Sequence, residues 1–121
     1  MRSGLNLTWN RPGTVKTLHN FTYLMNRKTI IIDGNNFSDL ETFFDEIDRV
    51  LTKDLTWKTG HNMNAFNDLL LGGFGVYEYE EPVKIVWINF KKSEGLLGKP
   101  LTGDLKKYIT DHKHIEFVAE G

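Results

Sequence analysis

The sequence predicts an α/β domain in which a small three-stranded parallel sheet is packed with helices. Two segments, KTIIID (28–33) and VKIVWINF (83–90), are almost continuously apolar, which is typical of strands buried on both faces. Two helical patterns lie between them, and another precedes a third strand over 114–120. Strands separated by helices favour parallel pairing with right-handed crossovers. The expected order is β-α-α-β-(turn)-α-β.

The first helix follows the first strand after a turn signal at Asp33-Gly34. Ser38 is the expected N-cap, because Glu41 stands three residues later and would complete a capping box. Apolar residues then recur at helical spacing over 40–51, while the acidic side chains fill the solvent face. This helix should pack its apolar side on the sheet.

The second helix follows a connector, 52–60, whose Trp57 either plugs the core or stands at a binding surface. Asn62 can cap this helix, and Gly72 and Gly73 end it because glycine readily takes the left-handed C′ conformation. Its apolar stripe should face the same core as the first helix. Seven side chains from the two helices and the second strand should be buried together: Phe43, Phe44, Ile47, Phe66, Leu69, Val86 and Trp87.

The remaining segments are less regular. Residues 74–82 should form a loop and 91–100 an irregular segment or a helical turn, before a third helix of roughly three turns around Leu105. Residues 1–27 show no sustained period, so we expect an N-terminal extension that is mobile or adds an edge element. Residues 28–121 should form the folded domain.

Composition and charge limit the function classes. The 121 residues suit one domain, no apolar run approaches the ~20 residues of a membrane span, and the first residues lack the apolar core of a signal peptide. Cysteine is absent, which fits a cytoplasmic protein. Residues 1–27 carry a net charge of +4, whereas 33–81 hold eleven acidic and three basic residues, a net charge of −8. That acidic segment should repel nucleic acid and attract a basic protein.

Three kinds of chemistry find little support in the residue pattern. The glycines of GGFG (72–75) close a helix rather than open one, so a phosphate cradle is not expected. His112 and His114 could share one face of an extended segment, but no third metal ligand is evident. No nucleophile motif or carboxylate pair indicates catalysis. We therefore expect no enzyme activity, no metal site and no cofactor.

The polar face of the second helix is its most informative feature. Asn64, Asn67 and Asp68 lie at i, i+3 and i+4, so they share the side opposite the apolar stripe. Asp68 stands near the C-terminal end, where the helix dipole opposes a negative charge by roughly a few tenths of a kcal/mol or more. Exposure to solvent is enough to explain the two asparagines. At Asp68, binding to a positively charged group in a complex would offset the unfavourable helix-dipole energy. The remaining catalytic alternative uses His61 with Asn64 and Asp68.

Four stretches carry a resemblance to a known family over residues 28–118. They are TIIIDGNNFSDLETFFDEID, GHNMNAFNDLLLGG, VKIVWINF and HIEFVAE, and the second, with Gly-x-Asn-Φ-x-Ala-Φ-x-Asp-x-Leu, is the most specific. The chain resembles the barstar family, the intracellular inhibitors of secreted ribonucleases. This resemblance implies a barstar-like fold and a protein that blocks a basic ribonuclease active site with the second helix and its flanking loops.

The resemblance implies partner-binding roles for that helix and the loops around it. The aspartate matching Asp68 sits where the substrate phosphate would sit, so its carboxylate meets arginine, lysine and histidine side chains. Gly60 and Asn62 match the loop that enters the helix, and Gly72 matches the glycine that closes it. The predicted partner-binding set is Lys58, Gly60, His61, Asn62, Asn64, Asn67, Asp68, Gly72, Gly73 and Phe74.

Within the helix and its entry loop, four residues depart from the family pattern. Asn64 replaces the second acid of the helix, Asn67 replaces an aromatic residue, and Lys58-Thr59 replaces a tyrosine pair. One acidic charge of the expected surface is therefore missing.

Outside the second helix, the chain differs from the family pattern at two further sites, after the helix and on the third helix. The aromatic contact expected after the helix falls on Gly73-Phe74, offset by one residue. The acid expected on the third helix falls near Lys107, for which Asp104 or Asp111 could substitute in another register. The leading hypothesis is an inhibitor of a basic ribonuclease that is monomeric when free. The alternative is an interaction module of the same fold whose partner is another basic protein; neither hypothesis involves direct binding to nucleic acid or to a membrane.

Overall fold

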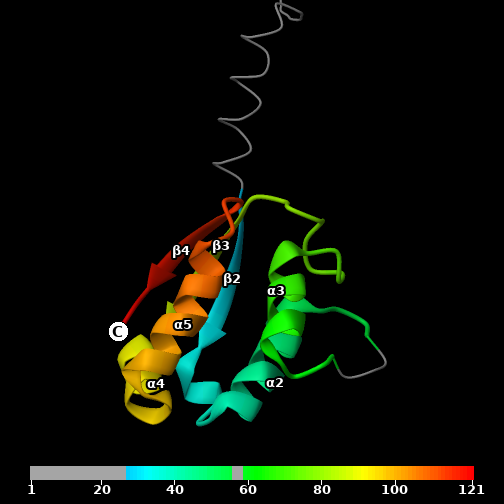
Figure 1. The fold of residues 1–121 in the computed structure, drawn as a ribbon. Helices are drawn as coiled ribbons and strands as arrows, with labels where there is room; N and C mark the ends of the chain where they lie inside the picture. The colour runs from blue at the N-terminus through cyan, green and yellow to red at the C-terminus, as the bar shows by residue number, and fades with distance from the viewer. Residues whose placement is uncertain (1–26, 56–58) are drawn as a thin grey trace, which may run out of the picture.

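Three parallel strands form one sheet in the order β2-β3-β4, with β3 in the centre (Figure 1). They are β2 (Lys28–Asp33), β3 (Val83–Ile88) and β4 (Ile115–Ala119). The pairing aligns Ile30 with Ile85, and Ile85 with Phe117, so one row of apolar side chains crosses the sheet. The predicted fold class, an α/β domain with a three-stranded parallel sheet, is confirmed.

The computed structural model describes residues 27–55 and 59–121. The expectations for the N-terminal extension before Arg27, for Trp57 and for Lys58 lie outside these residues.

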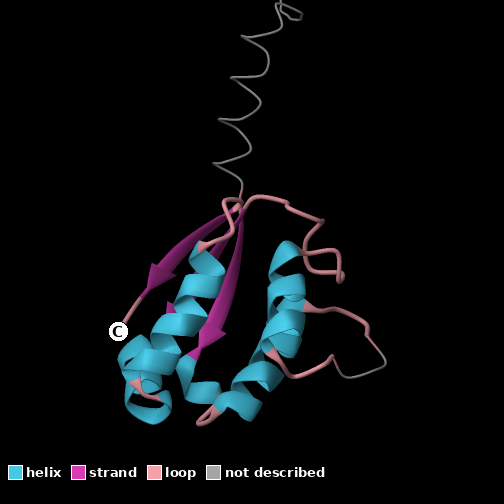
Figure 2. Ribbon diagram, in the orientation of Figure 1, coloured by secondary structure: helices cyan, strands magenta, loops and turns pink. Residues whose placement is uncertain are grey.

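Helices α2 (Leu40–Leu51), α3 (Met63–Leu71) and α5 (Lys99–Thr110) cover one face of the sheet (Figures 1 and 2). A fourth helix, α4 (Phe90–Leu97), lies beside the N-terminal end of α5. Within the described ranges, none of the helices has the length and apolar character needed to cross a membrane.

Helix α2 begins one residue later than predicted. Its N-cap is Asp39, whose side chain accepts a hydrogen bond from the Thr42 N–H at 2.8 Å. The Thr42 hydroxyl accepts in return from the Asp39 and Ser38 N–H groups, at 3.1 and 3.0 Å. The capping box predicted for Ser38 and Glu41 is therefore wrong. An aspartate carboxylate is the stronger acceptor at the positive end of the helix. The hydrogen bonds that the Thr42 hydroxyl and the Thr42 N–H donate to this carboxylate lower the pKa of Asp39.

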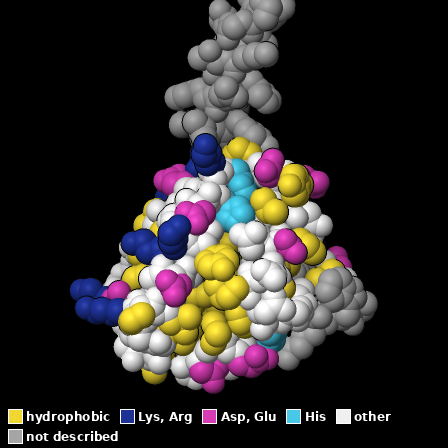
Figure 3. Space-filling view, viewed as in Figure 1, with side chains coloured by type: hydrophobic (Ala, Val, Ile, Leu, Met, Phe, Trp, Pro, Cys, Tyr) yellow, Lys and Arg dark blue, Asp and Glu magenta, His cyan; other side chains and the backbone are white. Residues whose placement is uncertain are grey.

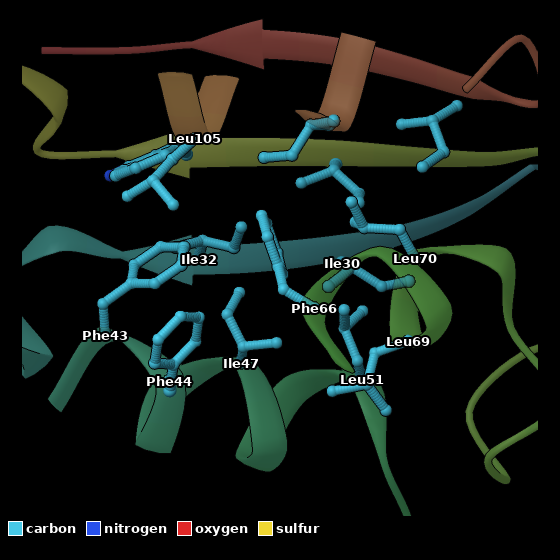
Figure 4. Packing of buried hydrophobic residues seen from close by; sticks show 14 of the residues in the cluster. Ile30, Ile32, Phe43, Phe44, Ile47, Leu51, Phe66, Leu69, Leu70 and Leu105 are labelled. Atoms are coloured by element: carbon cyan, nitrogen blue, oxygen red, sulfur yellow. The ribbon is translucent and has the colours of Figure 1, made fainter. Parts of the chain in front are cut away.

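The core lies between the sheet and helices α2, α3 and α5 (Figure 4). Phe43 is its centre: the ring stacks on Trp87 at 5.4 Å and meets Phe37 and Phe66 edge-on at 5.2 and 5.4 Å. Phe66 projects from α3 into the space between α2 and β2 (Figure 4). Six of the seven predicted core residues belong to this single cluster: Phe43, Phe44, Ile47, Phe66, Leu69 and Trp87.

The prediction that the first strand is buried on both faces is wrong. Strand β2 is at the edge of the sheet and the described helices cover only one face, so Ile31 is 42% exposed while Ile30 and Ile32 are buried. Val86 pairs with Ile31 and alternates with Ile85, whose side chain faces the core, so the Val86 side chain points to the opposite face of the sheet. Val86 is buried, with 7% of its surface exposed, but it does not belong to the core cluster.

Glu46 also departs from the predicted pattern, because this acid of α2 is buried rather than solvated. Its carboxylate accepts from the Asp33 N–H at 3.0 Å and from the Asn36 amide at 3.1 Å. It also accepts two hydrogen bonds from Arg49 at 2.8 and 2.9 Å, which raise the pKa of that guanidinium. Glu46 thus ties the end of β2 to α2.

The segment after β3 is more regular than predicted. The strand ends at Ile88, and Asn89 with φ 56° turns the chain into α4, where an irregular segment or a single turn was expected. Ser93 of α4 is buried and accepts a hydrogen bond from the Trp87 indole at 3.0 Å. This contact fixes α4 to the core, although the helix itself lacks a strong apolar period.

Candidate partner-binding site

Helix α3 starts where the sequence predicts. The Asn62 side chain caps it by accepting from the Ala65 N–H at 2.8 Å. Phe66, Leu69 and Leu70 anchor one side of the helix in the core. The opposite side, which carries the candidate polar residues, faces outward.

The C-terminal end of α3 is enclosed by hydrogen-bond donors. The Leu70 carbonyl accepts from the Tyr77 hydroxyl at 2.7 Å and pairs with His114 Nε2 at 3.0 Å. The Leu71 carbonyl accepts from the Glu80 N–H at 2.7 Å. These donors offset the negative charge of the helix end, which reduces the cost of an acid nearby.

Gly72 is the C-cap of α3, as predicted, but with φ 98° and ψ −173° it does not adopt the predicted left-handed helical conformation. It and Gly73 both have positive φ, 98° and 93°. A Cβ on Gly72 would lie 2.5 Å from the Glu78 carbonyl oxygen and 2.7 Å from the Tyr77 ring, whereas nothing lies within 4 Å of a Cβ on Gly73.

Gly72→Ala should therefore destabilise the domain more than Gly73→Ala. Both changes place a Cβ at a positive φ that L-residues rarely adopt, which costs roughly 1–3 kcal/mol, and overpacking at Gly72 should add roughly 1–3 kcal/mol. Urea unfolding of the two variants measures the difference. Equal losses would show that the neighbouring loop does not restrict Gly72.

The outward face of α3 carries an acid without a partner. Asn64 and Asp68 are exposed, and the side-chain oxygen of the half-buried Asn67 accepts a hydrogen bond from His112 Nε2 at 2.9 Å. Over residues 27–55 and 59–121, no hydrogen bond or ion pair involves the Asp68 carboxylate. Asp68 is thus available to a cation from another molecule.

His61 points away from this face. Its side chain is 9% exposed and lies against α2, with Nδ1 2.6 Å from Glu41 and Nε2 3.1 Å from Asp48. Asp45 is 3.6 Å from Nε2, and the Thr59 hydroxyl also donates to Asp48. Thr59 and His61, at the end of the loop that enters α3, are therefore clamped to α2, and we interpret His61 as a positioning residue.

The clamp also sets the charge of His61. Partial burial opposes protonation, but the hydrogen bonds and charges of Glu41 and Asp48 outweigh it, so the pKa of His61 is raised. The same carboxylates make the neutral ring a poorer partner for α2 than the charged ring.

The stability contributed by His61 should fall as pH rises. Its contribution is complete below the unfolded pKa of about 6.5 and is lost as pH passes through the raised folded pKa. Urea unfolding of the wild-type protein and His61→Gln at about pH 6 and about pH 8.5 tests this. The difference in unfolding free energy between the wild-type protein and His61→Gln should be smaller at the higher pH. Titration of His112 contributes equally to both proteins and so does not affect this difference. A difference that widens would contradict the charged clamp.

The sequence model of the family described as Barstar (barnase inhibitor) matches residues 27–102, well over half of the 121 residues. The chain belongs to the barstar family. The matched segment contains β2, α2, α3, β3 and α4, and therefore the whole candidate helix. No curated protein matches the chain.

In this barstar-family protein, the loop after α3 turns its first aromatic residue inward. Gly73 is exposed, but Phe74 packs against the core, and its carbonyl accepts from the Lys53 N–H at 2.9 Å. Tyr79 is instead the exposed aromatic of this loop, at 65%. Sequence analysis missed Tyr79; the signal available was the charged EYEE turn around it.

Lys107 stands on α5, where the barstar resemblance places an acid. Its ammonium pairs with Asp111 at 3.0 Å, so part of its charge is already matched within the helix. Lysine and arginine side chains gather over α5 and α4 on the left of Figure 3, away from α3. On this face of the molecule, the basic side chains therefore lie on the α5 side rather than over α3.

His112 and His114 contact each other, with ring centroids 5.5 Å apart. Burial and the neighbouring His114 lower the pKa of His112, against the opposing charges of Asp111 and Glu80. In the described part of the chain no group of three or more histidine or acidic side chains could hold a metal ion. Both rings instead bond α3, through Asn67 and Leu70.

Proposed function

We propose that the protein inhibits a basic ribonuclease by placing the outward face of α3 over the nuclease active site. The observation that carries this proposal is Asp68, an exposed carboxylate without a partner among the described residues, on a helix that is fixed at both ends. In the active site, its oxygens would take the place of a substrate phosphate and accept hydrogen bonds from arginine, lysine or histidine.

The surroundings of Asp68 support a preorganised binding surface. The entry loop is clamped through His61 and the exit through Tyr77, so little ordering is needed on association. The net charge of −8 over 33–81 would attract a basic partner, and association should slow as salt rises. Family membership adds the expectation that the partner is a ribonuclease.

The predicted contacts divide accordingly. Asn62, Asn64, Asn67 and Asp68 would meet the nuclease, while Gly60 and the glycines after α3 allow close approach. The free protein would be a monomer in the cytoplasm, in keeping with its lack of cysteine. It would act without a cofactor and without binding nucleic acid or membrane.

An inhibition titration tests this function. Increasing amounts of the protein are added to a purified basic secreted ribonuclease, and cleavage of an RNA substrate is followed. Activity should fall to zero at one equivalent of inhibitor. A complex that forms while the nuclease stays fully active would favour the alternative, an interaction module for another basic protein surface.

A further inference from the structure

Tyr79 is the most exposed large hydrophobic side chain in the described part of the molecule, at 65%, against 47% for Leu96 and 42% for Ile31. A single exposed apolar side chain is common and by itself indicates nothing. Tyr79 differs because its backbone is fixed, because it borders the face of α3, and because exposed acids flank it.

The backbone that presents Tyr79 is a closed turn. The Glu81 N–H donates to the Glu78 carbonyl at 3.0 Å, and the Glu81 carboxylate accepts from the Glu78 N–H at 2.8 Å. Glu80 holds φ 56°, a conformation that non-glycine residues adopt only when the surrounding structure requires it. The ring therefore extends from a rigid support rather than from a loose loop.

The turn is continuous with the face of α3. The Glu80 N–H bonds the last carbonyl of the helix, at Leu71. Glu80 also lines a hollow of about 420 Å³ together with His112, which in turn bonds Asn67 of α3. Figure 3 shows the histidine side chains between the upper ends of α5 and α3, next to hydrophobic and acidic groups. A partner seated on Asp68 would extend over this hollow toward the turn.

The charges around the ring define the partner. Glu78 and Glu80 are exposed on either side of Tyr79, whereas Glu81 is already paired with Lys28 at 3.5 Å. A guanidinium or ammonium group can lie over a tyrosine ring while it bonds a neighbouring carboxylate. The combination suits a cationic side chain of a protein, not an anion or an apolar helix.

We propose that the 78–81 turn is a second contact element of the α3 surface, in which Tyr79 receives a cationic side chain from the rim of the partner's active site. The inference rests on the proposed function, because the same basic protein must cover α3. The Asp68 carboxylate would then occupy the phosphate position of the nuclease active site. Tyr79 would then favour basic ribonucleases that carry a cationic side chain at this place on the rim.

Three variants test this inference against a purified basic secreted ribonuclease, with barnase as the first probe and other basic secreted ribonucleases after it. Tyr79→Ala should weaken binding by about 3- to 30-fold, mainly through faster dissociation. Tyr79→Phe should keep most of the affinity because it keeps the ring. Leu96→Ala, an exposed apolar residue of α4, is the matched control and should change nothing. Thermal unfolding should be the same for all three variants, since both side chains are exposed.

The outcomes separate the two proposals. If Asp68→Asn weakens the complex but Tyr79→Ala matches the wild-type protein, the second contact is wrong and the proposed function stands. If Tyr79→Ala and Leu96→Ala lose affinity equally, the ring has no specific role. If no basic ribonuclease binds the wild-type protein, the proposed function fails and the role of Tyr79 fails with it.

Discussion

Phe43→Ala should lower the free energy of unfolding by about 3–5 kcal/mol, which is the expected range for removing a fully buried aromatic ring. Phe43 has no exposed surface, and its ring contacts Phe37, Phe66 and Trp87. These neighbours come from the loop before α2, from α3 and from β3, so they cannot all move to fill the space. Urea unfolding followed by tryptophan fluorescence measures the loss.

Leu96→Ala is the control for this measurement, because that side chain is 47% exposed and its loss should be within about 0.5 kcal/mol. A loss at Phe43 as small as that at Leu96 would contradict the packing of α2 and α3 on the sheet. Because Phe66 connects Phe43 to α3, the same substitution should also make the binding helix less rigid.

Asp68→Asn should weaken partner binding by about 3–5 kcal/mol, because the nuclease cations would be buried without the carboxylate that neutralises them. The free energy of unfolding of the free domain should stay the same or rise by roughly a few tenths of a kcal/mol, since the helix dipole no longer opposes a charge. Glu120→Gln removes the same charge from an exposed position just after β4 and should leave affinity nearly unchanged. Calorimetric titration and thermal unfolding of the three proteins measure both quantities.

Loss of stability without loss of affinity would show that Asp68 is a structural residue. Equal losses of affinity for Asp68→Asn and Glu120→Gln would mean that net charge alone matters. Either result would remove the reason for placing Asp68 at a phosphate position.

The fold was predictable from the sequence where hydrophobic period and caps agree. The span of α2, the Asn62 cap and Gly72 at the end of α3 are all local signals, and the structure contains each of them. The N-cap of α2 was misplaced by one residue because Ser38 and Asp39 are both good acceptors, and only the path of the chain decides between them.

Errors arose where the environment of a residue depends on distant segments. The three isoleucines of β2 look equally buried in sequence, but Ile31 faces a side of the sheet that the described helices leave uncovered. Glu46 looks like any acid of an amphipathic helix, yet the end of β2 brings the Asp33 N–H and Asn36 to it. Such contacts are not encoded in spacing along one helix.

The sequence predicts which face of the second helix is exposed, but it does not predict how the residues of the neighbouring loops are placed. The helix and its outward polar face follow from the 3.6-residue period, and the structure leaves Asp68 exposed there. The inward direction of His61 and the prominence of Tyr79 depend on how loops fold back on α2 and α3. The partner-binding roles themselves remain proposals.

Competition with an RNA analogue tests the phosphate-mimic role of Asp68 most directly. The affinity of the inhibitor for a basic ribonuclease is measured at increasing concentrations of a non-cleavable dinucleotide that occupies the nuclease active site. If Asp68 sits at the phosphate position, the apparent affinity should fall in proportion to nucleotide occupancy, and no ternary complex should form. A ternary complex with undiminished affinity would contradict this role, because α3 and the phosphate could then occupy the nuclease at the same time.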